Sequence, residues 1–230
     1  MKTLSALVCL ALTALHVAAA DSAATVASAI KKLGGESGYA WTYTPKTVGS
    51  ESAARNQAPL SGKTEKDGYT LIRGEMGDVT VDIGIKGDKM AVNYSGDWLS
   101  TVEIGENNRT VQRLRALKRP TDEAEQLLAK STALKQEADG GYSSDLDGAW
   151  SKEMFALLGR RAADAPSASG NVRFWVKDGR LAKYEFVIRG KIATGADKKE
   201  TEVSRTTTVE IKDVGMTKVG LPEDAKKKLS

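Results

Sequence analysis

Cysteine and histidine are almost absent from this chain of 230 residues, which contains one of each, Cys9 and His16. Both lie near the start, where an apolar run over residues 4–17 is followed by three alanines that end at Ala20. This pattern is typical of a secretory signal, so we expect residues 1–20 to be removed by cleavage near Ala20. The mature chain would then lack thiols and imidazoles. That excludes disulfides, Cys or His catalysis, and zinc or copper sites built on nitrogen or sulfur ligands.

An excess of either charge is also missing. Lys and Arg number 34 against 30 Asp and Glu, a formal net charge of +4 that becomes +3 once Lys2 is lost with the signal. Nucleic-acid binding depends on clustered cations, so we expect no nucleic-acid partner. No apolar run of 18 residues follows the signal, and Cys9 lies within the apolar run rather than at the cleavage point. We therefore expect a soluble product without a lipid anchor, periplasmic or secreted.

The N-terminal part of the mature chain predicts one helix and then strands. Apolar residues at helical spacing predict a helix over residues 21–33 that stops at Gly34, and alternation from Tyr39 predicts a strand up to Pro45. A polar loop is expected over residues 46–59. From residue 60 to 99, short alternating runs are separated by Asp-Gly and Gly-Asp turn signals, which predicts an antiparallel meander with one apolar face.

The centre of the chain favours helices. Asn107 or Asn108 is a candidate cap for a helix that Pro120 ends, and Thr121 for a second that ends at Gly140. A third is expected over residues 147–158. Alternation then returns in long strands, with a break expected near Gly190, and a short helix with Pro222 in its first turn ends the chain. This order predicts one α+β domain over residues 21–230, a curved antiparallel sheet on central helices.

The C-terminal quarter carries a resemblance to a known group. The segments NVRFWVKDGRLAKYEFVIRG and TTTVEIKDVGMTKVGLPEDAKKKL, and the earlier KTEKDGYTL, resemble exported bacterial proteins with the fold of the lipoprotein carrier LolA and the mycobacterial LppX and LprG lipoproteins. The resemblance implies an incomplete β-barrel that curls around helices and leaves an apolar cavity. It also implies a lipid or an acylated protein as the ligand.

Two sets of residues are candidates for binding. Aromatic and aliphatic side chains on the apolar faces of the strands are candidates to line an acyl-chain cavity, although such side chains are more often ordinary core. Phe174 and Trp175 alternate, so one of them must face away from the core. The cavity candidates are Trp41, Tyr43, Val81, Ile83, Trp98, Phe174 and Phe186.

A basic segment before Pro120 is the second candidate, because it holds five cations and no acid. It is suited to an anionic membrane surface. Alternatively, it forms a solvated face whose charges are balanced by the acidic turn at Asp122, Glu123 and Glu125. Its cations are Arg109, Arg113, Arg115, Lys118 and Arg119.

No catalytic constellation emerges. Ser28 and Lys31 match S-x-x-K, but no partner motif follows, and Asp145 to Gly148 lacks the further ligands of a calcium loop. We therefore expect no cofactor, no metal and no enzymatic activity, but binding or carriage of an apolar ligand. The alternative is a structural or protein-interaction module with a filled core. A hydrolase that uses carboxylates alone is more distant. The sequence does not indicate an oligomeric state.

Overall fold

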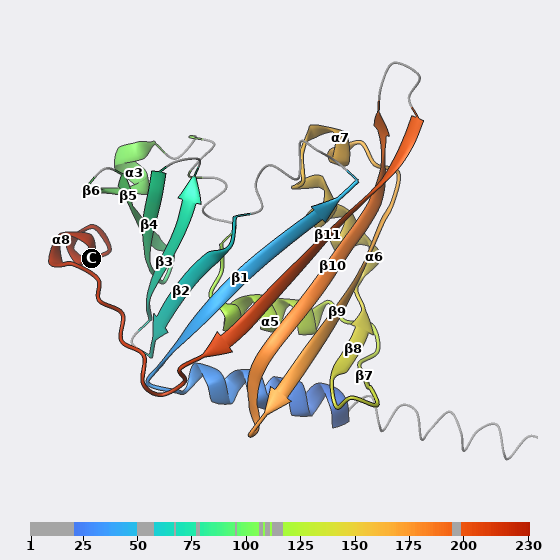
Figure 1. Cartoon of the computed structure of the whole chain (residues 1–230), viewed down its shortest axis with the longest axis horizontal. Helices are drawn as coiled ribbons and strands as arrows, with labels where there is room; N and C mark the ends of the chain where they lie inside the picture. Colours follow the sequence, from blue (N-terminus) through green and yellow to red (C-terminus); the bar gives the residue numbers. More distant parts are fainter. Residues whose placement is uncertain are drawn as a thin grey trace, which may run out of the picture.

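The computed structural model consists of one large β-sheet with helices packed on it (Figure 1). It describes residues 21–49, 58–66, 68–76, 79–94, 96–105, 108, 111, 117–194 and 199–230. The predicted signal over residues 1–20 lies outside these residues. Within them, no helix is long and apolar enough to cross a membrane.

Eleven strands of the described chain form the sheet, and every neighbouring pair is antiparallel. Their order is β6-β5-β4-β3-β2-β1-β11-β10-β9-β8-β7, so the sheet does not close and β6 and β7 are its edges. The predicted α+β class with an incomplete barrel is thereby confirmed. The strands are β1 (Gly38–Val48), β2 (Leu60–Glu65), β3 (Tyr69–Met76), β4 (Val79–Lys86), β5 (Lys89–Tyr94), β6 (Asp97–Ser100), β7 (Lys135–Gln136), β8 (Tyr142–Asp145), β9 (Ala168–Lys177), β10 (Arg180–Thr194) and β11 (Lys199–Lys212).

Turn signals of the sequence separate consecutive strands of the sheet. The meander from β2 to β6 is connected in chain order, as the alternation and the Asp-Gly turns predict. The β9–β10 hairpin turns at Asp178 and Gly179, whose φ angles are +53° and +70°. Positive φ at both central residues is the type I′ geometry that matches the twist of paired strands, which is why Asp-Gly stands there.

Two strands run further than predicted. β1 continues through Pro45 to Val48. Among the described strands only β11 pairs with it beyond Tyr43, so Pro45 lies where one side of the strand is unpaired and proline is tolerated. β10 continues through Gly190, which pairs with Val203 and Ala168. Gly190 therefore does not interrupt the strand.

The helices differ more from the predictions. The described part of the N-terminal helix covers residues 21–34, and α6 (Gly148–Ala156) begins after the cap Asp147, both as expected. α5 (Pro120–Ala129) takes Arg119 as its N-cap, not Thr121, because Pro120 is suited to the first helical position. It ends eleven residues before Gly140, and β7 lies in the region predicted as helix. The remaining helices are α3 (Thr101–Ile104), α7 (Arg160–Ala163) and α8 (Glu223–Lys228).

The two faces of the sheet are covered by different parts of the chain. We call the face that carries Trp41 and Phe174 the inner face; the N-terminal helix, α5, α6 and α7 cover it and share the main hydrophobic cluster. On the opposite, outer face, α8 and the segment before it pack at the β6 end of the sheet (Figure 1). That second cluster comprises Ala91, Trp98, Val219, Leu221, Ala225 and Leu229.

Candidate functional site

The inner face has a continuous row of large side chains across six strands. Phe174 lies opposite Tyr184, Tyr184 opposite Val209, and Val209 opposite Tyr43. Tyr142 and Leu60 extend the row at its two ends. The rings of Phe174 and Tyr184 are 6.5 Å apart between centroids and tilted by 39°, a favourable aromatic contact. The row lies beneath the central helices.

Most of the predicted cavity residues share this face. Trp41, Val81, Ile83, Phe174 and Phe186 are buried in the main cluster, and Tyr43 is half-buried against it. Trp98 is not among them, because it lies on the outer face in the α8 cluster. It pairs with Asn93, whereas the preceding strand residue Val92 belongs to the main cluster. Alternation separates the two faces of a strand but does not reveal which segment covers each of them.

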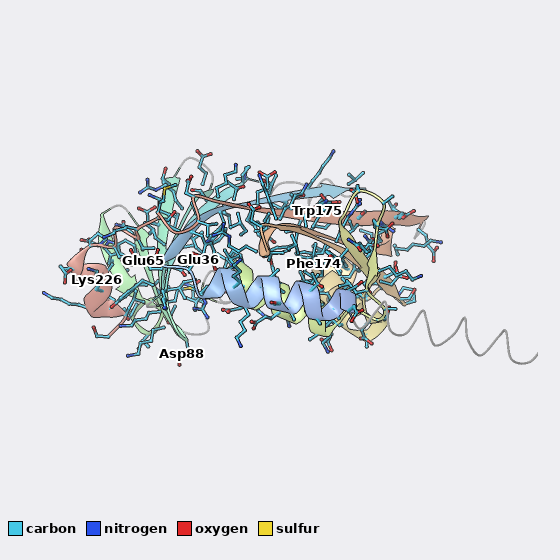
Figure 2. The ribbon with its side chains drawn as sticks, turned by 90° about the horizontal axis from the view of Figure 1, so that it is seen from below. Glu36, Glu65, Asp88, Phe174, Trp175 and Lys226 are labelled. Atoms are coloured by element: carbon cyan, nitrogen blue, oxygen red, sulfur yellow. The ribbon has the colours of Figure 1, made fainter. Side chains whose placement is uncertain are left out.

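Phe174 and Trp175 separate as predicted. Phe174 is fully buried, whereas Trp175 lies on the outer face, half-buried between two cations (Figure 2). Arg173 Cζ is 4.9 Å and Lys183 Nζ 4.6 Å from the Trp175 ring centroid. These distances are within the range of cation–π contacts, so local cations cover the ring that faces away from the core.

The two central helices approach the inner face differently. The backbone of α6 lies close to those of β9 and β10, and α5 makes no comparably close backbone approach to any strand of the described chain. Glycines allow the α6 contact: a Cβ on Gly190 would meet the Phe155 ring at 2.6 Å, and one on Gly170 would lie 3.0 Å from Ser151 Oγ. Beneath α5 the strands carry tyrosines instead. Side chains therefore fill the space between α5 and the sheet.

A half-buried acid, Glu123, lies in that space. Tyr184 Oη donates a hydrogen bond of 2.7 Å to Glu123 Oε2 on α5. Burial raises the pKa of Glu123 to about 7, against the opposing effect of the Tyr184 hydrogen bond and of the nearby cations Lys118 and Arg205. Burial also raises the pKa of Tyr184 well above its ordinary value, with Glu123 adding to the effect. The carboxyl therefore titrates near neutral pH inside the fold.

Tyr43 connects this acid to an arginine on the sheet. Burial and then the Glu123 carboxyl raise the pKa of Tyr43, whereas Arg205 and the Thr207 hydroxyl lower it by charge and by hydrogen bonding. Arg205 and Thr207 both lie on β11, two residues apart and on the inner face with Val203 and Val209. The interior under α5 thus contains a small polar cluster, Glu123, Tyr184, Tyr43, Arg205 and Thr207.

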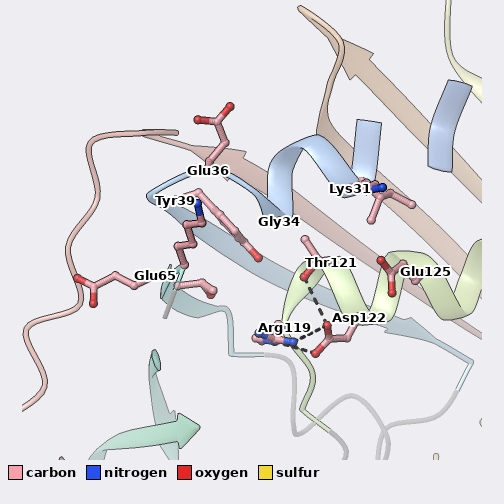
Figure 3. A pocket seen from close by; sticks show the side chains of 12 residues that line it. Lys31, Gly34, Glu36, Tyr39, Glu65, Arg119, Thr121, Asp122 and Glu125 are labelled. Carbon is pink, nitrogen blue, oxygen red and sulfur yellow. Dashed lines mark hydrogen bonds and ion pairs between the residues drawn. The ribbon is translucent and has the colours of Figure 1, made fainter. Parts of the chain in front are cut away.

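A polar cleft of about 280 Å³ lies where the N-terminal helix ends and α5 begins (Figure 3). The buried Tyr39 ring is directed toward the gap between Gly34 and Thr121. Its hydroxyl lies beside Thr64 and Thr121 without a hydrogen bond of ordinary geometry, and burial raises its pKa. The cleft is lined by Ile30, Lys31, Gly34, Glu36, Tyr39, Thr64, Glu65, Lys66, Arg119, Thr121, Asp122 and Glu125.

Charges around the cleft are largely satisfied within the chain. Arg119 donates two hydrogen bonds, of 2.8 and 2.9 Å, to the Asp122 carboxylate. Glu36 accepts a hydrogen bond of 3.0 Å from Arg180, and Glu65 accepts one of 2.6 Å from the Val219 backbone. The polar groups around the cleft therefore connect the two helices with the start of β1.

Of the five cations of the basic segment, the structure describes Lys118 and Arg119. Lys118 donates to Gln126 Oε1 at 2.6 Å and Arg119 is paired with Asp122, so both cations contact α5. Arg109, Arg113 and Arg115 lie outside the described residues. The proposed membrane contact of this segment stays a prediction. Among the residues that the structure describes, no group of three or more His, Cys, Asp or Glu could hold a metal ion.

Of the polar cluster, only Tyr43 was among the binding candidates that the sequence predicted. Glu123 was assigned to the first helical turn and its dipole, and only the fold reveals that it turns inward. Arg205 did leave a signal: it occupies an in-phase position of the alternation that places Val203, Val209 and Ile211 on the inner face. A cation at an apolar phase of a strand is the pattern that could have identified it.

Sequence comparison finds no relatives: no protein-family model and no curated protein matches the chain. Solved structures do match. They include LprF from Mycobacterium bovis, with 9% identity over 89% of this chain and 97% of that one and a TM-score of 0.48. Another is the lipoprotein LppX from Mycobacterium tuberculosis, with 12% identity over 86% and 97% and a TM-score of 0.46.

A LolA superfamily protein from Nitrosomonas europaea also matches, with 10% identity over 85% of this chain and 94% of that one and a TM-score of 0.32. Members of the group that the sequence resembles, LppX and a LolA superfamily protein, are thus among the structural neighbours. With TM-scores below 0.5, these matches carry no argument about ligands, which must come from the chain's own residues.

Proposed function

We propose that this chain is an exported, non-enzymatic protein that binds or carries an apolar ligand, a lipid or the acyl chain of a lipoprotein, between α5 and the inner face of the sheet. The observation that carries the proposal is the separation of α5 from the strands, which side chains bridge without close backbone contact. The signal over residues 1–20, its cleavage and the single mature domain over residues 21–230 are parts of the same proposal.

The covering surfaces are suited to an acyl chain. The inner face presents Trp41, Phe186 and Val209, and α5 presents Ala124 and Leu127, all buried in one apolar cluster. Each methylene transferred from water into such an environment contributes about 0.8 kcal/mol. The free energy gained by burying the acyl chain is what would offset the cost of opening α5.

Entry of the ligand requires α5 to move outward, because the inner face is covered in the present structure. The movement would break the Tyr184–Glu123 hydrogen bond and separate Ala124 and Leu127 from the strands. It would leave α6 in place, because α6 packs closely against β9 and β10. Opening of one helix over a fixed sheet is a known type of ligand-dependent transition.

Native mass spectrometry of the purified protein, followed by extraction with organic solvent, tests whether a lipid is bound. We expect a co-purifying lipid, and a rise in Tm on addition of oleate or phospholipid. A homogeneous apo mass without any thermal shift would contradict the proposal and favour a protein-interaction module. Such a module would have little edge to offer, since the edge strands β6 and β7 have only four and two residues.

A brominated fatty acid locates the ligand, because bromine quenches indole fluorescence only at short range. We expect dibromostearate to quench wild-type fluorescence and Trp41→Phe to remove part of that quenching. Trp98→Phe is the matched control, because this indole is equally buried but lies on the outer face. Equal loss of quenching in the two variants would contradict binding beneath α5.

A further inference from the structure

We propose that Arg205 is the anchor for an anionic head group, a carboxylate or a phosphate, of the ligand that lies beneath α5. This inference rests on the proposed function and specifies the chemical class of its ligand. It concerns the polar cluster on β11 and β1, which apolar binding alone would not require.

The register places Arg205 on the inner face. It lies opposite Ile188 on β10 and opposite Thr47 on β1, and both partners are buried. Val203 and Thr207, which flank it at the same phase of β11, are also buried. Arg205 is therefore a half-buried residue on a largely apolar surface.

The charge of Arg205 has no counter-charge at contact distance among the described residues. No Asp or Glu of the described chain lies within 4.0 Å of its guanidinium. Glu123 interacts with it only at longer range, and burial raises the pKa of that carboxyl to about 7. Near neutral pH, Glu123 is therefore partly protonated and supplies less than one negative charge.

Hydroxyl donors accompany the arginine. Thr207 Oγ1 is fully buried and has no hydrogen bond of ordinary geometry in the structure, and the Tyr43 hydroxyl interacts with both Arg205 and Thr207. A buried hydroxyl without a partner costs free energy until a group binds to it. An oxyanion between these groups would accept hydrogen bonds from all three.

The chemistry of the group favours a planar or tetrahedral oxyanion. A guanidinium presents paired N–H donors that match carboxylate and phosphate oxygens, and it is more weakly hydrated than an ammonium. A charge-assisted hydrogen bond in a partly desolvated place is worth roughly 10- to 100-fold in affinity. The acyl chain would continue along the apolar row toward Val209 and Trp41, on the same face.

Titration with oleate, oleyl phosphate and oleyl alcohol tests the anchor, because the three ligands share one chain and differ in the head group. We expect the full chain to bind the two anions roughly 10-fold or more tightly than the alcohol. Arg205→Gln should weaken binding of the anions about 10-fold and leave the alcohol unchanged. Arg205→Lys, which keeps the charge, should retain part of the preference.

Arg189→Gln is the matched control, since Arg189 lies on the outer face of β10 and donates to Asn171 Oδ1 at 2.9 Å. It should change none of the three affinities. Equal binding of all three ligands by wild type, or an equal loss of all three in both Arg205 variants, would overturn the anchor and leave the proposed function standing. Failure of wild type to bind any of them would overturn the proposed function itself.

Discussion

The inner face has two regions that differ in how a helix is attached to it. On the α6 side, Gly170 and Gly190 let the helix approach so closely that Phe155 fills the place of a glycine side chain. On the α5 side, the strands carry Tyr43 and Tyr184 instead of glycines, and the helix is attached through side chains and the partly buried Tyr184–Glu123 hydrogen bond. Close packing fixes α6 on the sheet, whereas the attachment of α5 through side chains is the feature on which the proposed opening rests.

The largest expected effect comes from disrupting the contact between α6 and the sheet. Phe155→Ala removes a fully buried ring from a close contact, so we expect the free energy of unfolding to fall by about 3–5 kcal/mol. Urea denaturation monitored by circular dichroism measures it. Leu157→Ala is the control, because this leucine is 69% exposed just after the same helix and should change stability by less than about 0.5 kcal/mol. A loss at Phe155 no greater than the control would show that α6 is not closely packed.

A smaller effect tests the glycine that permits this contact. Gly190→Ala introduces a Cβ that would lie 2.6–2.9 Å from atoms of the Phe155 ring, so strand and ring must shift apart. We expect a loss of about 1–3 kcal/mol in the same denaturation experiment. Gly220→Ala is the matched control, because a Cβ at that position would meet no atom within 4 Å. If the two variants were equally stable, the close approach at Gly190 would be refuted.

The α5 side, unlike the α6 side, should make the stability of the fold depend on pH through Glu123. The pKa of Glu123 is about 7 in the folded state, above its ordinary 4.5, so its neutral form stabilises the fold. This stabilisation is fully present below pH 4.5 and is lost as the pH rises through 7. We expect it to amount to roughly 2 kcal/mol, discounted because Glu123 remains partly exposed.

Denaturation of wild type and Glu123→Gln at several values between about pH 4.5 and 8 measures this contribution. Relative to Glu123→Gln, wild type should lose stability as the pH rises over that range, because the introduced amide does not titrate. Glu125→Gln is the control, since Glu125 is on the same helix but exposed. A constant difference between wild type and Glu123→Gln would mean that the carboxyl is solvated and is not held between α5 and the sheet.

Local patterns of the sequence were sufficient for much of the fold. Alternation and turn residues predicted the meander and the long C-terminal strands, Asp147 predicted the start of α6, and Phe174 and Trp175 were assigned to opposite faces. Pro45 and Gly190 were misjudged as strand ends, because their tolerance depends on what lies beside them. Pro45 borders an unpaired strand edge and Gly190 faces the Phe155 ring.

By itself, the sequence determined which residues alternate, where the chain turns, and that residues 21–230 contain no thiol or imidazole. The tertiary structure alone decided that β1 pairs with β11, that Trp98 lies on the outer face, and that Glu123 and Arg205 meet Tyr43 inside. The physical reason is range. Periodicity and turn preference act over a few residues, whereas burial, pairing and the pKa of a buried acid depend on segments far apart in the chain.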